Sequence, residues 1–449
     1  MSQYSIPLSQ YLNFSSGNLA AFTKVAKSIA VIPVLLLALL SLTALEAQTN
    51  YTILQCLEGS DAHQPIAKQQ PLIEAAHRAA VAQLRANLLP QASLNGQATW
   101  QSDVTELPIK LPNFEVPAIS RDQYRLTLEL TQSLWDGGQI ARQTELMEAQ
   151  TKIEQQRIQI DRYSAREQVI SLYCATLLAQ KQTEALLAAQ KDVQAKIGRL
   201  TEQIKNGTAI PSASYGFEAR QLELEQQTEE AQAHKRAAIE GLSLLTGLPI
   251  RIEDVLATTT AAENNSTAER PELQLFSLQQ QSTLAQEQLA RIKSMPRLNA
   301  IATLGYARPG LNFLSNEFEP YAIVGVNMRW NLSAFYSGSI TKERQQYRLQ
   351  SERVAAQREQ FLLQTTVRQR QVEQDLVRLR TALQKDQNII GLREKVAATA
   401  AVQLENGLLT PSEYLTETTQ ITTARLYTAI HEIQLLQATL QLAFLQGKL

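Results

Sequence analysis

The amino-acid sequence predicts a mainly α-helical fold with a small β part: long antiparallel coiled-coil helices plus four transmembrane strands per chain. The chain of 449 residues has only 6% aromatics and 17 glycines, while Gln, Ala, Leu and Glu dominate, a mixture that favours long helices. Its second half repeats the first at an offset of about 200 residues. Segments of about ten residues alternate apolar and polar side chains, as strands with two different faces do.

The chain begins with an export leader. Lys24 and Lys27 precede an apolar run at 29–42, and small residues follow it at 43–47. A basic flank, a short apolar core and a small residue before the cut describe a secretory signal peptide, so we predict one over residues 1–47. No later run is apolar enough to cross a bilayer as a helix, and any membrane insertion is therefore expected to be by strands.

The two cysteines, Cys56 and Cys174, allow several interpretations. An oxidising compartment would permit a disulfide between them, and Cys56 lies near enough to the leader to suggest a lipid anchor. However, residues 53–55 lack the small residue that lipid attachment to a following cysteine requires, and polar residues 48–50 separate Cys56 from the apolar run. We favour two unpaired, mostly buried thiols.

The repeat divides the mature chain into two copies, 48–249 and 271–449, joined by a low-complexity connector at 250–270. Glycines, Asn-Gly pairs and prolines recur in register between the copies: Gly138 with Gly338, Asn206-Gly207 with Asn406-Gly407, and Pro211 with Pro411. Because the spacing between matching residues stays constant over this length, the sequence indicates duplication of a single helix–strand–strand–helix unit.

The helices are predicted in the same order in each copy. A medium helix, at 72–89 and again at 271–293, leads into two strands. A very long helix then follows, at 138–204 and again at 339–404, and at 1.5 Å per residue each is roughly 100 Å long. After a tight break another long helix returns. Such long and polar helices cannot fold around a core of their own, and coiled-coil packing is the usual solution.

Four strands are predicted, at 92–100, 124–131, 298–305 and 324–332. Each alternates apolar with polar residues and has the length that crosses an outer membrane. A half-buried sheet of a soluble protein shows the same alternation, but the export leader and the long helices favour the membrane. The polar faces would then line the lumen, including Arg125, Thr127, Glu129, Asn327 and Arg329.

The number of strands predicts an oligomer. Four strands cannot close a membrane barrel, since the smallest single-chain barrels use about eight. Open sheet edges are not tolerated in lipid, so several chains must share one barrel if these strands cross a membrane.

In this plan and its motifs, the chain resembles the TolC-like outer-membrane efflux (outer membrane factor) family over nearly the whole mature sequence. The motifs are Leu89-Pro90 before the first strand, 134–138 (Leu-Trp-Asp-Gly-Gly) after the second, Asn206-Gly207 with Pro211, and 406–413 (Asn-Gly-Leu-Leu-Thr-Pro-Ser-Glu). No single motif is specific for the family, but the whole set in this order, present in both copies, is specific for it.

The resemblance implies a homotrimer in the outer membrane of a Gram-negative bacterium, with a shared twelve-stranded barrel and an α-helical tunnel that extends into the periplasm. The chain would be a passive exit duct in a tripartite efflux or secretion system. An inner-membrane transporter would deliver substrates through a periplasmic adaptor (membrane fusion) protein that docks on the tunnel tip.

The tip residues are the candidate docking site: Asn206, Gly207, Pro211, Asn406, Gly407 and Pro411. Asn and Gly tolerate the left-handed conformation that ends a helix, and Pro suits the start of the next helix. Glu413 has two compatible interpretations. It completes a capping box with Thr410, and it is the candidate gate residue. Relatives with a gated tip carry aspartates beyond the second tip glycine, whereas this chain offers only Glu413, so a charged constriction would be thinner.

Other function classes are not favoured. The net charge of −1 and the scattered basic residues give no surface for nucleic acid. The four histidines are dispersed, and no phosphate-binding loop is present, so no metal, cofactor or enzymatic activity is predicted. The alternative is a secreted coiled-coil adaptor or structural spacer, although a spacer has no reason to interrupt its helices with paired strands.

Overall fold

The computed structural model describes residues 50–105, 119–208, 210–258 and 269–449. The predicted signal peptide, 1–47, lies outside these ranges. By its contacts the chain divides into two units, and in the smaller one only Asn50 and 253–255 are described. The larger unit comprises 51–252 and 256–449.

Both halves of the larger unit share the order medium helix, two long strands, very long helix and returning helix. The first half contains α2 (Ile53–His63), η1 (Pro65–Lys68), α3 (Gln69–Ala86), β2 (Gln91–Trp100), β3 (Asp122–Trp135), α4 (Gln139–Lys205) and α5 (Ser212–Thr246). The second contains α6 (Pro271–Arg291), η2 (Ile292–Ser294), β5 (Arg297–Arg308), β6 (Glu319–Arg329), α7 (Ser333–Tyr336), α8 (Ser339–Glu405) and α9 (Pro411–Leu445). Two short strands, β1 (Asn50–Tyr51) and β4 (Val255–Leu256), lie where the chain passes between the units. The predicted mainly helical fold is confirmed.

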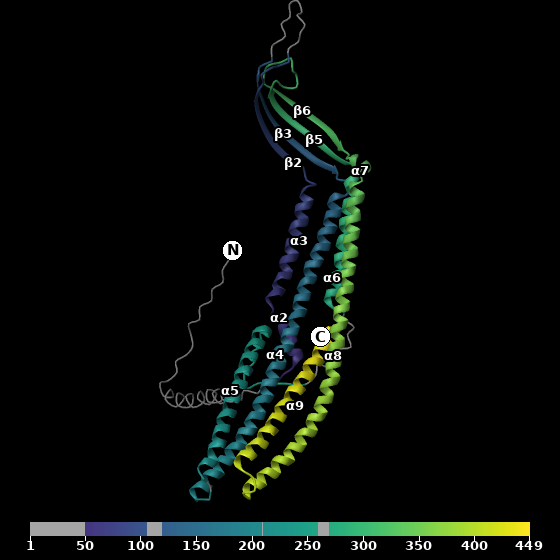
Figure 1. Ribbon diagram of the computed structural model, residues 1–449. Coiled ribbons are helices and arrows are strands. Elements are labelled where there is room, and N and C mark those ends of the chain that lie inside the picture. The colour runs from purple at the N-terminus through teal and green to yellow at the C-terminus, as the bar shows by residue number, and fades with distance from the viewer. Residues whose placement is uncertain (1–49, 106–118, 209, 259–268) are drawn as a thin grey trace, which may run out of the picture. The chain divides into compact units, whose positions relative to one another are not determined.

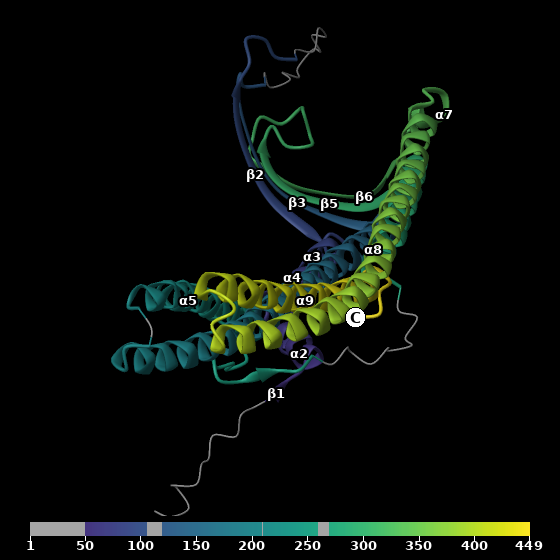
Figure 2. The same cartoon turned by 60° about the horizontal axis from the view of Figure 1, so that its bottom comes forward.

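The long strands form one antiparallel sheet in the order β2-β3-β5-β6. Figure 2 shows them as a single curved layer. The sheet of the single chain is open, with β2 and β6 at its edges. Leu94 stands opposite Leu128, and Leu304 opposite Leu128 and Ala322, so the predicted apolar positions of neighbouring strands share one face.

The fourth strand ends earlier than predicted. The alternation suggested a strand to residue 332, but β6 stops at Arg329, and Trp330 and Leu332 lie beyond it. In the first half, by contrast, β3 continues to Trp135. The second half instead forms the short helix α7, and the Trp330 indole N–H donates to the Ser294 carbonyl at 3.0 Å. The alternating pattern continues past the point where the backbone leaves the sheet.

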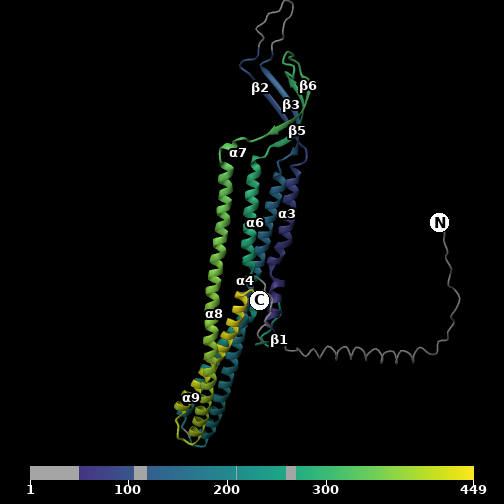
Figure 3. The ribbon, with the colours of Figure 1, turned by 90° about the vertical axis from the view of Figure 1, so that its right-hand side faces the viewer.

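The long helices connect the sheet to two hairpin turns. Helices α4 and α8 each have 67 residues. In the larger unit the strands lie at one end of these helices and the α4–α5 and α8–α9 turns at the other (Figure 1). Helix α4 packs on α3, α5, α6 and α9, and α8 packs on α6 and α9, with α3, α4, α6 and α8 side by side in Figure 3. No helix in the described ranges is both long and apolar enough to cross a bilayer.

The largest apolar core lies where α2, α4, α5 and α9 meet, around the fully buried Tyr173. Helix α2 was not predicted. Its Ile53, Cys56 and Leu57 are buried in this core, and Thr52 caps its first turn through Gln55. Cys56 and Cys174 are both buried and unpaired, which confirms the preferred interpretation of the cysteines. Burial raises the pKa of both thiols to about 12.

Candidate functional site

The first hairpin turn ends α4 with a left-handed glycine. Gly207 has φ +72°, a conformation that favours glycine because a Cβ is strained there. Its N–H donates to the Ile204 carbonyl at 3.0 Å, and the Thr208 N–H donates to the Gln203 carbonyl at 2.9 Å. These two bonds form a Schellman motif, which satisfies the last carbonyls of a helix. The Asn-Gly pair predicted to end this helix does so.

The second turn repeats this geometry at the end of α8. Gly407 has φ +71° and donates to the Leu404 carbonyl at 3.1 Å. Leu408 donates to the Gln403 carbonyl at 2.8 Å. A Cβ added at Gly207 or at Gly407 would meet nothing within 4 Å. Both turns therefore have open space around them, as a contact surface requires.

The two hairpins restart their second helices differently. Pro211 directly precedes α5 and has no side-chain cap, whereas Pro411 is the first residue of α9. Thr410 and Glu413 form the predicted capping box. The Thr410 N–H and hydroxyl donate to Glu413 Oε2 at 2.9 and 2.7 Å. These bonds from the Thr410 backbone and side chain lower the pKa of the exposed Glu413 carboxyl.

The turns of both hairpins line one groove of about 540 Å³. Of the predicted tip residues, Gly207, Gly407 and Pro411 line it, while Asn206, Asn406, Pro211 and Glu413 do not. Apolar and cationic side chains share the walls: Lys196, Arg199, Leu200, Ile210, Leu404 and Leu409. The structure thus brings the two predicted turns together as one surface.

A single carboxylate links the hairpins at the edge of this groove. Glu405, the last residue of α8, forms an ion pair with Arg199 of α4, and Lys196 Nζ lies 3.5 Å from the same Glu405 oxygen. The Lys196 ammonium also lies 5.1 Å from the centre of the Tyr414 ring. Two cations against one carboxylate leave this side of the tip positively charged.

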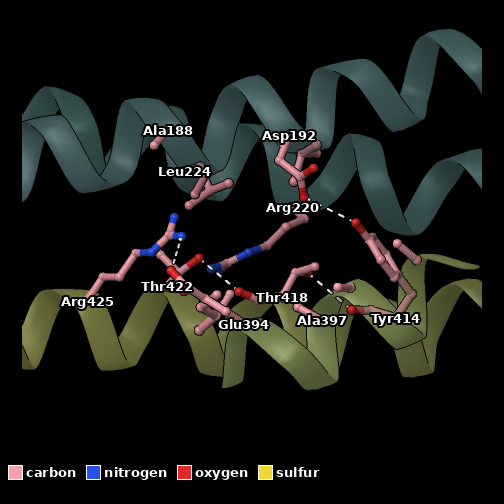
Figure 4. Close-up of a pocket in the computed structure, with 15 residues that line it drawn as sticks. Ala188, Asp192, Arg220, Leu224, Glu394, Ala397, Tyr414, Thr418, Thr422 and Arg425 are labelled. Carbon is pink, nitrogen blue, oxygen red and sulfur yellow. Dashed lines mark hydrogen bonds and ion pairs between the residues drawn. The ribbon is translucent and has the colours of Figure 1, made fainter. Parts of the chain in front are cut away.

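Further along the helices, the hairpins border a cavity of about 350 Å³ whose walls combine charged and polar side chains with alanines and larger apolar residues (Figure 4). The Tyr414 hydroxyl donates to Asp192 Oδ2 at 3.2 Å, and Arg425 pairs with Glu394 at 3.0 Å. Arg220 extends from α5 into the space between the hairpins. Burial, and then the neighbouring Asp192 carboxylate, raise the pKa of Tyr414 well above its usual range, so its hydroxyl is a neutral donor.

This cavity was not predicted from the sequence. One signal was available, because Asp192 and Tyr414 break the repeat: their counterparts at the offset of about 200 residues are Leu392 and Ser214. A departure from an otherwise regular duplication marks positions where the two hairpins play different parts.

The predicted lumen residues share one face of the sheet. Arg125, Glu129, Asn327 and Arg329 alternate with the apolar residues and are exposed. Thr127 lies on the same face but is buried, with only 6% of its surface exposed. It stands opposite Gly305, and a Cβ on Gly305 would lie 2.1 Å from Cζ of Tyr321. The ring of Tyr321 thus crowds this part of the polar face.

The opposite face is apolar over its middle. It presents Leu94, Leu126, Leu128, Leu130, Leu304, Val324, Val326 and Met328 as exposed side chains. An exposed apolar surface of this extent marks contact with a protein or a membrane. Among the described residues, no His, Cys, Asp and Glu side chains gather into a group that could hold a metal ion.

Comparison with known proteins agrees with this arrangement. Residues 66–248 match the family model described as outer membrane efflux protein. The predicted resemblance to the outer-membrane efflux family is confirmed. No curated protein sequence matches the chain. The efflux-protein match covers α3, the first strand pair, α4 and α5, which is the first copy of the repeat.

Solved structures extend the likeness to most of the chain. The outer membrane protein VceC of Vibrio cholerae is 15% identical with a TM-score of 0.66, and the match covers 88% of this chain and 96% of that one. The Campylobacter jejuni CmeC outer membrane channel is 14% identical with a TM-score of 0.64, over 88% and 85%. The open state of the Neisseria gonorrhoeae MtrE outer membrane channel is 11% identical with a TM-score of 0.62, over 88% of each chain. The chain has the fold of outer-membrane efflux channels.

Proposed function

We propose that this chain is the outer-membrane channel subunit of a tripartite efflux or secretion system. It would be a passive exit duct for substrates that an inner-membrane transporter delivers through a periplasmic adaptor. The apolar face of the sheet carries this proposal, because its middle offers lipid a surface without charged side chains. The efflux-protein fold supports the same function.

The open edges of the sheet support assembly into a homotrimer. Edges β2 and β6 present unpaired backbone groups, which cannot stay unpaired in lipid. Pairing β6 of one copy with β2 of the next would close the sheet into a shared barrel. With the apolar face outward, Arg125, Glu129, Asn327 and Arg329 would line the lumen.

The tip groove supports docking of the adaptor. It lies at the end of the helices far from the strands (Figure 1), where a periplasmic partner could reach it. Its apolar residues, Ile210, Leu404 and Leu409, suit the buried part of an interface, and Lys196 and Arg199 favour an acidic rim on the partner. In a trimer the exposed Glu413 carboxylates would approach the axis at the same end, where they could act as a gate.

Membrane fractionation tests the channel proposal. The processed chain should be found with the outer membrane, require detergent for extraction, and form pores in planar bilayers. A processed chain that remains in the soluble periplasmic fraction would refute the duct and favour the secreted spacer.

Substitutions at the tip test the docking proposal. Gly207→Trp and Gly407→Trp should abolish export while the oligomer stays in the membrane, because both positions face open space. Gly207→Asn and Gly407→Asn are matched controls, since Asn tolerates the left-handed conformation, and export should persist. Export that continues in both Trp variants would exclude docking at these turns.

A further inference from the structure

Two arginines stand directly opposite each other at one end of the sheet. Arg297, the first residue of β5, and Arg329, the last residue of β6, are register partners. Both belong to the polar face, since the next pair on that face is Asn299 with Asn327. Both are exposed. This end of the strands adjoins the helices, so the pair lies where a barrel would open into a helical tunnel.

The pair is unusual because neither charge is compensated. Like charges directly opposite across two strands repel and destabilise a sheet. In the described part of the chain, no ion pair or side-chain hydrogen bond reaches either guanidinium group. Two cations of the adjoining helical region, by contrast, have acidic partners: Lys293 pairs with Glu343 at 2.7 Å, and Arg344 with Glu287 at 3.0 Å. The opposed arginines are therefore left as a concentrated positive charge.

Arg125 shows how differently an arginine on the same face can be placed. It stands opposite Gln97 and Ala307 in the neighbouring strands, so no like charge faces it. Glu129 lies four residues along the same strand, on the same face. Arg125 is thus a single charge in mixed surroundings, whereas Arg297 and Arg329 reinforce each other.

We propose that Arg297 and Arg329 form an anion-selective band at the tunnel end of the barrel lumen. The inference rests on the proposed channel function and extends it to selectivity. Each chain of a trimer would contribute one pair to a ring around the passage. Rings of Arg or Lys select anions in pores, and a passage with low-dielectric walls focuses the field of its charges. Anionic solutes, including those with carboxylate or phosphate groups, would thus be favoured over cations.

The test is the reversal potential of the purified channel in planar bilayers under a gradient of KCl. Replacing both residues, Arg297→Gln with Arg329→Gln, should lower the permeability of chloride relative to potassium by at least about twofold at low salt, where screening is weak. Charge reversal, Arg297→Glu with Arg329→Glu, should turn the preference towards potassium. Arg125→Gln is the matched control and should change the ratio less than the double glutamine variant does.

Thermal dissociation of the oligomer separates selectivity from a structural role. The double glutamine variant should be at least as stable as the original, because it removes repulsion between opposed charges. If the double glutamine variant conducts with unchanged selectivity, or fails to assemble, the proposed anion-selective band is wrong. Neither outcome would contradict the proposed channel function. Absence of any conductance in the unsubstituted protein would instead overturn the channel itself.

Discussion

The Tyr414 hydroxyl donates a hydrogen bond of 3.2 Å to Asp192 Oδ2 and so ties the second helical hairpin to the first. Tyr414 belongs to α9 and Asp192 to α4, and the tyrosine side chain is 3% exposed. Phe217 of α5 packs beside the Tyr414 ring with centres 6.0 Å apart. The contact is therefore a polar bond within an apolar seam, and separating the two hairpins at this point would require breaking it.

Tyr414→Phe should loosen this end of the hairpins. The substitution keeps the ring in the seam and removes only the hydroxyl. The lost hydrogen bond should lower the free energy of unfolding by about 1 kcal/mol, because water can solvate the exposed Asp192 carboxylate. We expect a lower temperature of thermal unfolding and a larger single-channel conductance in planar bilayers.

Tyr427→Phe is the control for this change. Tyr427 also lies on α9, but it is 56% exposed, so removing its hydroxyl should alter neither property. Equal conductance in the original protein and in Tyr414→Phe would mean that the bond does not hold the tip closed.

Two substitutions should separate the role of Glu413 as a helix cap from its proposed role as a gate. Glu413→Gln removes the charge but keeps an acceptor, and the chain already uses glutamine this way, because Thr52 and Gln55 form a capping box in α2. Glu413→Ala removes both. Alanine should lower the unfolding temperature and glutamine should not. A change of conductance or cation preference in Glu413→Gln would support the gate, whereas unchanged channel properties would leave Glu413 a cap only.

The pH dependence of the same cap has a definite sign. The bonds from Thr410 lower the pKa of Glu413 in the folded state, so its contribution to stability is present above the unfolded pKa of about 4.3. That contribution is lost as pH falls through the lowered folded pKa. As the pH is lowered from 6 to about 3, the free energy of unfolding should therefore decrease more for the original protein than for Glu413→Ala. Parallel pH profiles for the two proteins would contradict this.

The turns and the strand faces could be predicted because their signals are local. An Asn-Gly pair followed by proline ends one helix and starts another whatever surrounds it, and Gly207 and Gly407 have the positive φ this requires. Alternation likewise assigns Leu128 and Arg125 to opposite faces without knowledge of the neighbouring strands. The capping box of Thr410 and Glu413 is also set by a local signal, and its prediction is confirmed.

The parts that were missed depend on tertiary packing. Thr127 has the right parity for the lumen, but Gly305 across the sheet gives room to the Tyr321 ring, and the threonine becomes buried. The bond between Asp192 and Tyr414 joins residues 222 positions apart, and no local pattern sets that contact. Helix α2 is short, and its burial depends on α4 and α5 packing around it.

Arg270 should anchor the start of α6 against the other helices. Its guanidinium pairs with Glu272 at 2.5 Å and lies 5.0 Å from the Phe361 ring and 5.7 Å from the Phe444 ring. The side chain is 12% exposed. Arg270→Lys keeps the charge but loses the planar guanidinium, which both stacks on the rings and bonds to the carboxylate. This change should lower the free energy of unfolding by about 1–2 kcal/mol. Arg353→Lys, at an exposed position of α8, should be neutral in thermal unfolding. Equal unfolding temperatures for the two variants would contradict the anchor.

The two faces of the sheet should respond oppositely to arginine. Leu128 is 44% exposed and Val326 66% exposed on the apolar face. Leu128→Arg and Val326→Arg should hinder assembly in the membrane, at roughly 2–4 kcal/mol each if these positions lie near the bilayer midplane. Thr131→Arg and Asn327→Arg are the matched controls, because both residues are exposed on the polar face. They should assemble normally and change conductance.

Thr127→Arg should fail for a different reason. The residue has the parity of the lumen set, yet its burial leaves no room for an arginine. Thermal dissociation of detergent-extracted oligomers, measured beside conductance, distinguishes these outcomes. If arginine is tolerated equally at Leu128, Val326, Thr131 and Asn327, the apolar face does not contact lipid. The sheet would then have to be covered by protein, and the shared barrel would be excluded.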